Sequence, residues 1–193
     1  MVEHSKNNPT SMAAVIGLDQ NKIIKLCESI SEQNSVIEAV NFNSPQQTVV
    51  GGHADAINRA IDIFKKEGAK LVKKLSVSLA SHTSLLRICS KDLSKYMNNM
   101  SFNMPLFPII HNFDASSKTQ ISDIISSLSE QVCSPVKWTE SMIRVSEMGI
   151  NTFLEVGPGQ VLTGLGKRID KSFITYPLFK ESDITKALDG LNS

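Results

Sequence analysis

The sequence predicts an α/β protein in which a small α+β, ferredoxin-like unit precedes a region built on a parallel sheet. Over residues 12–76, strand and helix patterns follow one another in the order βαββαβ, which is the order of a split-βαβ, ferredoxin-like unit. Over residues 77–193, short apolar strands alternate with helices, which favours a parallel sheet. A polar leader, residues 1–11, precedes both parts.

The first strand and helix of the small unit are marked by an apolar run and a capping residue. Residues 12–17 form an apolar run that is typical of a buried strand. Asp19 follows as a helix N-cap, and Leu18 is placed to pack against Ile23 in the first turn. The pattern therefore predicts a helix over residues 20–30.

A hairpin, a second helix and a last strand complete the small unit. Alternating apolar residues predict strands over 36–42 and 48–50, and the polar residues 43–46 predict the turn between them. Apolar residues at helical spacing over 56–64 predict the second helix, and residues 70–77 predict another strand.

The second part of the chain offers three short apolar strand candidates. They cover residues 106–110, 152–156 and 173–176. A helical pattern that includes Trp138 and Met142 separates the first candidate from the others. The alternation of strands with helices is the basis for the expected parallel sheet.

The overall composition narrows the class of protein. A chain of 193 residues with 41% apolar content can bury one sizeable core without metals or disulfides. The formal net charge of +1 and the dispersed basic residues provide no basic stripe for a phosphate backbone. The sequence therefore argues against a nucleic-acid partner.

Cysteine usage and hydropathy indicate the cellular compartment. Cys27, Cys89 and Cys133 are far apart and lack CxxC spacing, which argues against a disulfide framework and against a metal site. The first residues are polar where a signal peptide would be apolar, and no apolar run approaches membrane-spanning length. We therefore expect a cytoplasmic protein that does not enter a membrane.

His82 is the first residue that could carry chemistry. It stands where a strand is expected to end and an amphipathic helix to begin, and loops at strand ends face the crevice of an open α/β sheet. A neutral imidazole there could accept a proton from a serine hydroxyl. A histidine that caps a helix or lies on the surface would fit the local pattern equally, so both interpretations stay open.

Three further features have plain structural explanations. The stretch 155–162 reads as a strand, a glycine turn and a helix, which could bring helix amides toward an anion, but it lacks the full GxGxxG spacing of a dinucleotide site. Nucleotide binding at this turn is therefore disfavoured against tight packing. Gln131 in a helix and Asn43 in a turn could be solvated or capping residues.

Several segments, taken in their order and separation, resemble the bacterial malonyl-CoA:acyl carrier protein transacylases. Each segment alone is common, whereas the combination is highly specific, and the resemblance covers nearly the whole chain. The segments are residues 12–18, Asn-Phe-Asn-Ser-Pro at 41–45, Ser-His at 81–82, Gln131 with Pro-Val-Lys-Trp at 135–138, and Glu-Val-Gly-Pro-Gly at 155–159. The resemblance implies that residues 77–193 are the carboxyl-terminal part of an α/β-hydrolase-like acyltransferase domain.

The resemblance also implies an activity and a set of site residues. The family transfers a malonyl group from malonyl-CoA to the phosphopantetheine thiol of acyl carrier protein in fatty acid biosynthesis, with no cofactor beyond these substrates. A serine in a GHSxG elbow attacks the thioester, and a histidine serves as its base. His82 matches that histidine, Gln131 matches the residue whose main-chain carbonyl orients it, and Asn43 resembles an asparagine of the substrate cleft.

The departures from the family pattern concern the nucleophile. The sequence contains no GHSxG, no GQGSQ motif for the oxyanion hole, and no counterpart of the arginine that binds the malonyl carboxylate. A base without a hydroxyl to activate forms no acyl-enzyme, so we expect the isolated chain to be truncated and inactive.

Two functions remain open for such a chain. It could be the second piece of a split enzyme, whose amino-terminal fragment carries the GHSxG serine. Alternatively, it could be a non-catalytic module that binds acyl carrier protein.

Overall fold

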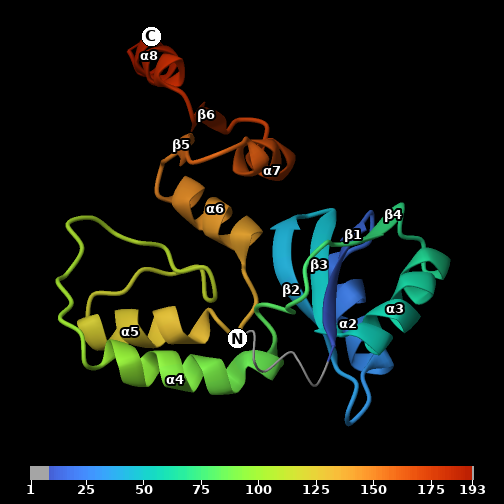
Figure 1. The fold of residues 1–193 in the computed structure, drawn as a ribbon. Helices are drawn as coiled ribbons and strands as arrows, with labels where there is room; N and C mark the ends of the chain where they lie inside the picture. Colours follow the sequence, from blue (N-terminus) through green and yellow to red (C-terminus); the bar gives the residue numbers. More distant parts are fainter. Residues whose placement is uncertain (1–8, 193) are drawn as a thin grey trace. The chain divides into compact units, whose positions relative to one another are not determined.

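The computed structural model describes residues 9–192, and within them the chain forms two compact units (Figure 1). The first unit ends at Ser141 and the second begins at Met142. Residues 1–8 of the predicted leader lie outside the described residues, and the first strand begins at Thr10. The sequence predicts a boundary between residues 76 and 77, whereas the two units of the structure divide after Ser141. A subdomain limit at residue 76 therefore stays a prediction.

The first unit is built on a four-stranded antiparallel sheet with the strand order β2-β3-β1-β4. The strands are β1 (Thr10–Ile16), β2 (Ile37–Ser44), β3 (Gln47–His53) and β4 (Leu71–Lys74). Strand β1 pairs with both β3 and β4, and β2 forms a hairpin with β3. This order confirms the predicted ferredoxin-like βαββαβ fold.

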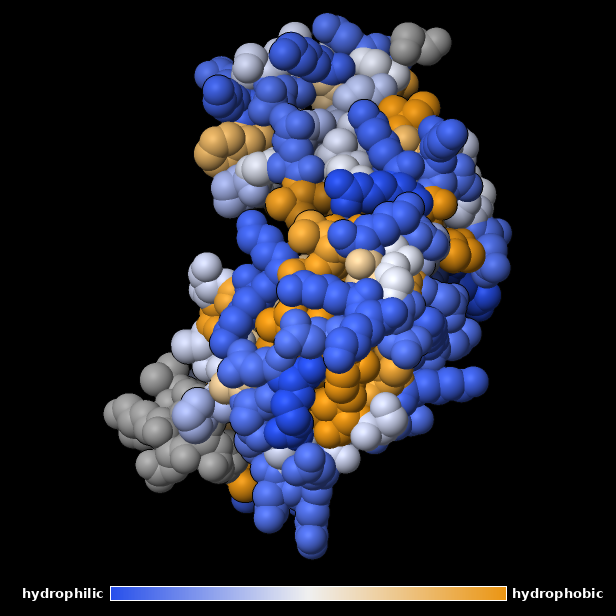
Figure 2. All heavy atoms as spheres, turned by 90° about the vertical axis from the view of Figure 1, so that its right-hand side faces the viewer, coloured by the Kyte–Doolittle hydropathy of each residue, from blue (hydrophilic) through white to orange (hydrophobic). Residues whose placement is uncertain are grey.

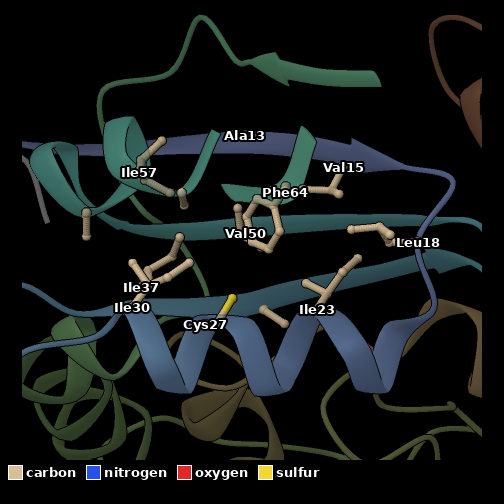
Figure 3. Packing of buried hydrophobic residues seen from close by; sticks show 13 residues of the cluster. Ala13, Val15, Leu18, Ile23, Cys27, Ile30, Ile37, Val50, Ile57 and Phe64 are labelled. Carbon is tan, nitrogen blue, oxygen red and sulfur yellow. The ribbon is translucent and has the colours of Figure 1, made fainter. Parts of the chain in front are cut away.

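Two helices, α2 (Gln20–Ile30) and α3 (Ala54–Lys66), cover one face of this sheet (Figure 1). Helix α2 has the predicted limits because the Asp19 carboxylate accepts hydrogen bonds from the main-chain N–H groups of Asn21 and Lys22. Figure 3 shows Ile23 and Cys27 of α2 pointing toward the strands, near Phe64 of α3. Each large side chain buried there stabilises the fold by about 1.5–3 kcal/mol.

The second face of the sheet is also covered. Met12, Val40 and Val49 form a smaller buried cluster on it with Ala80, which belongs to the segment after β4. Because successive side chains of a strand point to opposite faces, burial on both faces explains why residues 12–16 of β1 are all apolar. Strand β4 ends at Lys74, three residues before the predicted limit at Val77.

The rest of the first unit is helical and irregular. The short 3-10 helix η1 (Ser84–Leu86) leads into α4 (Arg87–Met97), and α4 lies beside α5 (Ile121–Glu130) (Figure 1). The predicted strand at residues 106–110 is wrong, because these residues form no strand in the structure. Their apolar pattern has no neighbouring strand within residues 9–141 to satisfy its main-chain groups.

The second unit contains two parallel strands and their helices. Helix α6 (Trp138–Glu147) runs into this unit, followed by β5 (Thr152–Val156), α7 (Val161–Ile169), β6 (Ile174–Leu178) and α8 (Glu181–Leu191). Strands β5 and β6 pair in parallel, which confirms the parallel strands predicted for this part. The rings of Phe153 and Phe173 meet edge to face, with their centroids 5.1 Å apart.

The outer surface on the side of α3 is largely polar. Figure 2 faces the side on which α3 lies in Figure 1 and shows hydrophilic atoms over most of it, with hydrophobic atoms between them. Exposed charged residues of α3 include Asp62, Lys65 and Lys66. Across residues 9–192, no helix is long and apolar enough to cross a bilayer.

Candidate active site

Hydrogen bonds fix the segment before His82 to the sheet. The Thr10 hydroxyl donates to the carbonyl of Ser78 at 3.0 Å and accepts from the main-chain N–H of Ala80 at 3.1 Å. The hydroxyl of Thr83, which is fully buried, donates to the carbonyl of Ala80 at 2.7 Å. The turn that carries His82 is therefore anchored to β1 and closed on itself.

Gly51 of β3 makes room for this turn. A Cβ atom added to Gly51 would lie 3.3 Å from Cγ2 of Thr83 and 3.5 Å from Cβ of Ala80. The absence of a side chain thus lets the turn approach the second face of the sheet closely.

The main chain of His82 has a left-handed conformation, with φ of 64°. Such a conformation costs a residue with a side chain about 1–2 kcal/mol. The His82 N–H donates to the carbonyl of Val132 at 3.1 Å, which helps to hold this conformation. Residues kept in sparsely populated regions gather at functional sites, so the geometry itself marks His82 as a candidate.

The imidazole of His82 is oriented by the main chain of Gln131. Nδ1 of His82 lies 2.6 Å from the Gln131 carbonyl oxygen. Because a carbonyl oxygen only accepts hydrogen bonds, Nδ1 carries the proton in the neutral ring. Nε2 is then left with its lone pair, and it can take a proton from an alcohol or a thiol.

Gln131 follows the last residue of α5 and is its C-cap. The last carbonyls of a helix have no partner inside the helix and carry its partial negative charge. The bond from His82 satisfies one of these carbonyls.

Asn43 lies in a different setting from the one expected. It is the half-buried residue at a register shift between Phe42 and Ser44 within β2. The prediction of a turn at residues 43–46 is therefore too wide, because the strand continues through the irregularity to Ser44 and only Pro45 and Gln46 form the turn. Among the described hydrogen bonds, none joins Asn43 to His82 or Gln131, so its place in a substrate cleft stays a prediction.

The sequence did not reveal the acidic partners of the histidine segment. Glu38 in β2 accepts hydrogen bonds from Ser84, and Glu130 forms an ion pair with Arg87 at 2.8 Å. In each of these two pairs, the acidic residue and its partner are more than forty positions apart in the sequence. The sequence offered one signal, which is that the acidic residue Glu38 stands between two apolar residues. These neighbours, Ile37 and Ala39, are buried in the structure.

A groove of about 720 Å³ opens beside this segment within the first unit. Residues of α2 and β2 line it together with Ser84, Arg87 and residues 133–135. Cys27 lies in the groove, and burial raises the pKa of its thiol to about 12, with the nearby Glu38 acting in the same direction. The thiol is protonated at neutral pH and is therefore a poor nucleophile.

The glycine turn after β5 is closed by a side chain of its own strand. The Glu155 carboxylate accepts hydrogen bonds from the N–H groups of Leu162 and Thr163, at 2.9 and 2.7 Å, and from the Thr163 hydroxyl at 2.6 Å. Burial alone would raise the pKa of Glu155, but these hydrogen bonds lower it. Since the first amides of α7 are already bonded, the turn is poorly suited to a nucleotide phosphate.

In the described part of the chain, no cluster of three or more His, Cys, Asp or Glu residues could hold a metal ion.

Comparison with known proteins gives a consistent set of relatives. No family model matches the sequence. The malonyl CoA-acyl carrier protein transacylase of Escherichia coli K12 is 39% identical over 179 residues, which are 93% of this chain and 58% of the relative. The protein of the same name from Haemophilus influenzae is 40% identical over 82% of this chain and 51% of its own length. The chain thus spans little more than half the length of these relatives.

Solved structures give the same result. The malonyl-CoA:acyl carrier protein transacylase of Xanthomonas oryzae superposes with a TM-score of 0.93 at 36% identity, covering 97% of this chain and 60% of the other. A malonyl-transacylase in complex with its type II PKS acyl-carrier protein superposes with a TM-score of 0.94 at 34% identity, with the same coverage. These matches confirm the predicted acyltransferase fold.

Proposed function

The chain belongs to the malonyl CoA-acyl carrier protein transacylase family, and we propose that it supplies the general base for malonyl transfer to acyl carrier protein. The hydrogen bond between His82 Nδ1 and the Gln131 carbonyl carries this proposal. It leaves Nε2 as the proton acceptor, which is the role that the family resemblance implies for His82. The chain spans 58% of the length of its Escherichia coli relative. We therefore propose the activity of a whole enzyme only for these 193 residues together with a further segment.

The proposed reaction has two halves that use the same base. In the first, a serine hydroxyl attacks the thioester carbon of malonyl-CoA, and Nε2 of His82 takes the hydroxyl proton. The carbon–sulfur bond breaks, and the coenzyme A thiolate recovers the proton from His82. In the second half, the phosphopantetheine thiol of acyl carrier protein gives its proton to His82 and attacks the malonyl-serine ester. The proton returns to the serine oxygen as that ester bond breaks.

In this proposal, the serine comes from a segment outside the given sequence. No GHSxG occurs in the 193 residues, and the protonated Cys27 thiol is no substitute for an activated hydroxyl. We propose that a polypeptide equivalent to the amino-terminal part of the relatives supplies the serine, the oxyanion hole and the arginine. The exposed apolar residues Leu106 and Phe107 of the first unit support this, because apolar surface of this kind favours a covering partner.

The remaining parts of the proposal follow from the family. Asn43 is proposed to line the substrate cleft, and the transfer is proposed to need no cofactor besides malonyl-CoA and phosphopantetheinylated acyl carrier protein. The free thiols of Cys27, Cys89 and Cys133 are compatible with the reducing cytoplasm, where we place the protein.

Complementation tests the proposal directly. The 193-residue chain is co-expressed with the amino-terminal part of the Escherichia coli relative that it does not cover, and transfer of labelled malonate from coenzyme A to acyl carrier protein is measured. We expect transfer by the pair, none by either piece alone, and a loss of about 10²–10⁴-fold in the His82→Ala variant. Transfer that survives His82→Ala would remove the proposed role of this residue.

A second function is supported by the likeness to a transacylase that is in complex with its acyl-carrier protein. In this case, the chain binds acyl carrier protein without performing chemistry. Titration of ¹⁵N-labelled acyl carrier protein with the chain, in the absence of any fragment, distinguishes this function. Saturable shifts without complementation would favour the binding module.

A further inference from the structure

The carboxylate of Glu38 binds the residue two positions after His82. Its Oε2 accepts a hydrogen bond from the Ser84 N–H at 2.8 Å, and its Oε1 accepts one from the Ser84 hydroxyl. Both oxygens of one side chain are thus committed to one residue. Ser84 is the first residue of η1, where N–H groups lack helical partners and favour a negative charge.

Glu38 is itself held on a rigid support. It lies in β2 and pairs with Gly51 of β3, between the buried residues Ile37 and Ala39. Gly51 is also the position against which the turn of Thr83 packs. The sheet therefore fixes both the carboxylate and the surface on which the histidine segment lies.

The segment that carries His82 is tied down on both sides of the strained residue. On one side, Ala80 is bonded to Thr10 of β1. On the other side, Ser84 is bonded to Glu38 of β2. Between them, His82 has its φ of 64°. A residue in such a conformation keeps it only when its surroundings over-determine it, and the bonds on either side act together with the bond from the His82 N–H to the Val132 carbonyl to prevent relaxation.

We propose that Glu38 is a positioning residue for His82, acting through Ser84 to hold the imidazole in register with the Gln131 carbonyl. This inference rests on the proposed function, in which His82 is the base. A general base works only within about 2.6–3.2 Å of the proton it takes. A small relaxation of residues 82–84 would therefore lower the rate without changing which groups are present.

The test uses the chain alone, so that it does not depend on malonyl transfer. Long-range ¹H–¹⁵N correlation spectra at about pH 8, where an ordinary histidine is neutral, report which ring nitrogen of His82 carries the proton. In the parent chain, we expect Nδ1–H to dominate. In Glu38→Ala, we expect the ratio of Nδ1–H to Nε2–H rings to fall about 2- to 10-fold, the effect of weakening one hydrogen bond.

Two variants serve as matched controls. Glu38→Gln keeps an oxygen that can accept from the Ser84 N–H, so it should restore most of the parent ratio. Glu28→Gln removes a carboxylate from an exposed position of α2 on the same groove, and it should leave the ratio unchanged. Amide spectra of the four strands verify that each variant is folded.

The outcome separates this inference from the proposed function. If Glu38→Ala is folded and its His82 ring keeps the parent ratio, Glu38 only stabilises the start of the helix and the inference is wrong. If the ratio falls as expected, the inference holds even if no fragment restores malonyl transfer. Where transfer is restored, Glu38→Ala should lower kcat about 10-fold with KM unchanged.

Discussion

The main-chain N–H of Phe42 donates to the carbonyl of Val136 at 2.9 Å, and the N–H of Val136 donates to the carbonyl of Val40 at 2.8 Å. The Thr139 hydroxyl adds a bond to the carbonyl of Phe42 at 2.9 Å. These bonds attach the chain after α5 to β2, which lies at the end of the sheet order. Gln131 comes shortly before Val136 in the chain. These bonds therefore help to fix the position of the Gln131 carbonyl relative to the sheet that also carries Glu38.

Replacing Val136 by proline should weaken this attachment. Proline has no N–H, so the bond to the Val40 carbonyl is lost and the carbonyl is left unpaired. We expect Val136→Pro to lower the free energy of unfolding by about 1–3 kcal/mol, measured by urea denaturation. Val136→Ile keeps the donor and is the control. Equal stability of the two variants would show that the attachment does not depend on this bond.

The side chain of Gln131 should be dispensable for orienting His82. The bond to Nδ1 comes from the main-chain carbonyl, which every residue provides. We expect Gln131→Ala to keep the Nδ1–H form of His82 in long-range ¹H–¹⁵N spectra. A shift of the proton to Nε2 in this variant would mean that the amide side chain takes part in holding the ring.

Local patterns predicted much of the fold, whereas pairings between distant segments were not predictable. The limits of α2 follow from the Asp19 cap and the apolar spacing after it, both of which lie within a few residues. The strand at residues 106–110 was wrong because a strand requires a partner that the pattern itself does not reveal. The apolar run there has the composition of a strand, but it pairs with neither β2 nor β4, the two edge strands of the sheet in the first unit.

The candidate site shows the same division. The family resemblance predicted that the Gln131 carbonyl contacts His82, and the structure shows this contact, whereas neither residue type nor spacing alone indicated it. The bond between Glu38 and Ser84 joins residues 46 positions apart, and it exists because β2 and the turn after β4 fold against each other. The register of a sheet decides such contacts, and a single sequence does not specify it over that distance.

Gly52 should tolerate no side chain. A Cβ atom there would lie 2.1 Å from the Val36 carbonyl oxygen and 2.8 Å from Cα of Ile37, both of which belong to the main chain. We expect Gly52→Ala to lower the free energy of unfolding by about 3 kcal/mol or more. Gly164 in α7 has open space around its Cβ position, so Gly164→Ala should instead stabilise its helix by about 0.5–1 kcal/mol. Urea denaturation of both variants checks the contrast.

His111 should make stability fall in mild acid. Burial lowers the pKa of His111 below its ordinary value of 6.5, with Asp114 opposing and Lys118 adding to the shift. Above 6.5, the ring is neutral in both states and has no effect. As the pH falls below that value, the unfolded chain gains a proton that the folded chain resists, so the free energy of unfolding decreases until the folded ring titrates. We expect lower stability at about pH 5.5 than at about pH 7.5.

The matched variant for this pH dependence is His111→Asn, which removes the titrating ring and keeps a polar side chain. Its stability should change less between the two pH values than that of the parent chain, whatever its absolute stability. An equal change in both chains would assign the pH dependence to other groups. Urea denaturation at each pH, with the ionic strength held constant, provides the comparison.

The last prediction concerns the exposed apolar residues of the irregular segment before α5. Leu106 is 93% exposed and Phe107 is 73% exposed, so neither side chain contributes much to the core of the first unit. Replacing both by aspartate should therefore change the free energy of unfolding by no more than about 0.5 kcal/mol. If this surface binds the amino-terminal fragment that supplies the serine, the same change should weaken complementation at least about 10-fold, because it places charges in an apolar interface.

Tyr96, which is 67% exposed on α4, provides the control variant Tyr96→Asp. Undiminished complementation by the double variant would show that the fragment docks elsewhere, whereas an equal loss in the control would indicate a general effect of added negative charge.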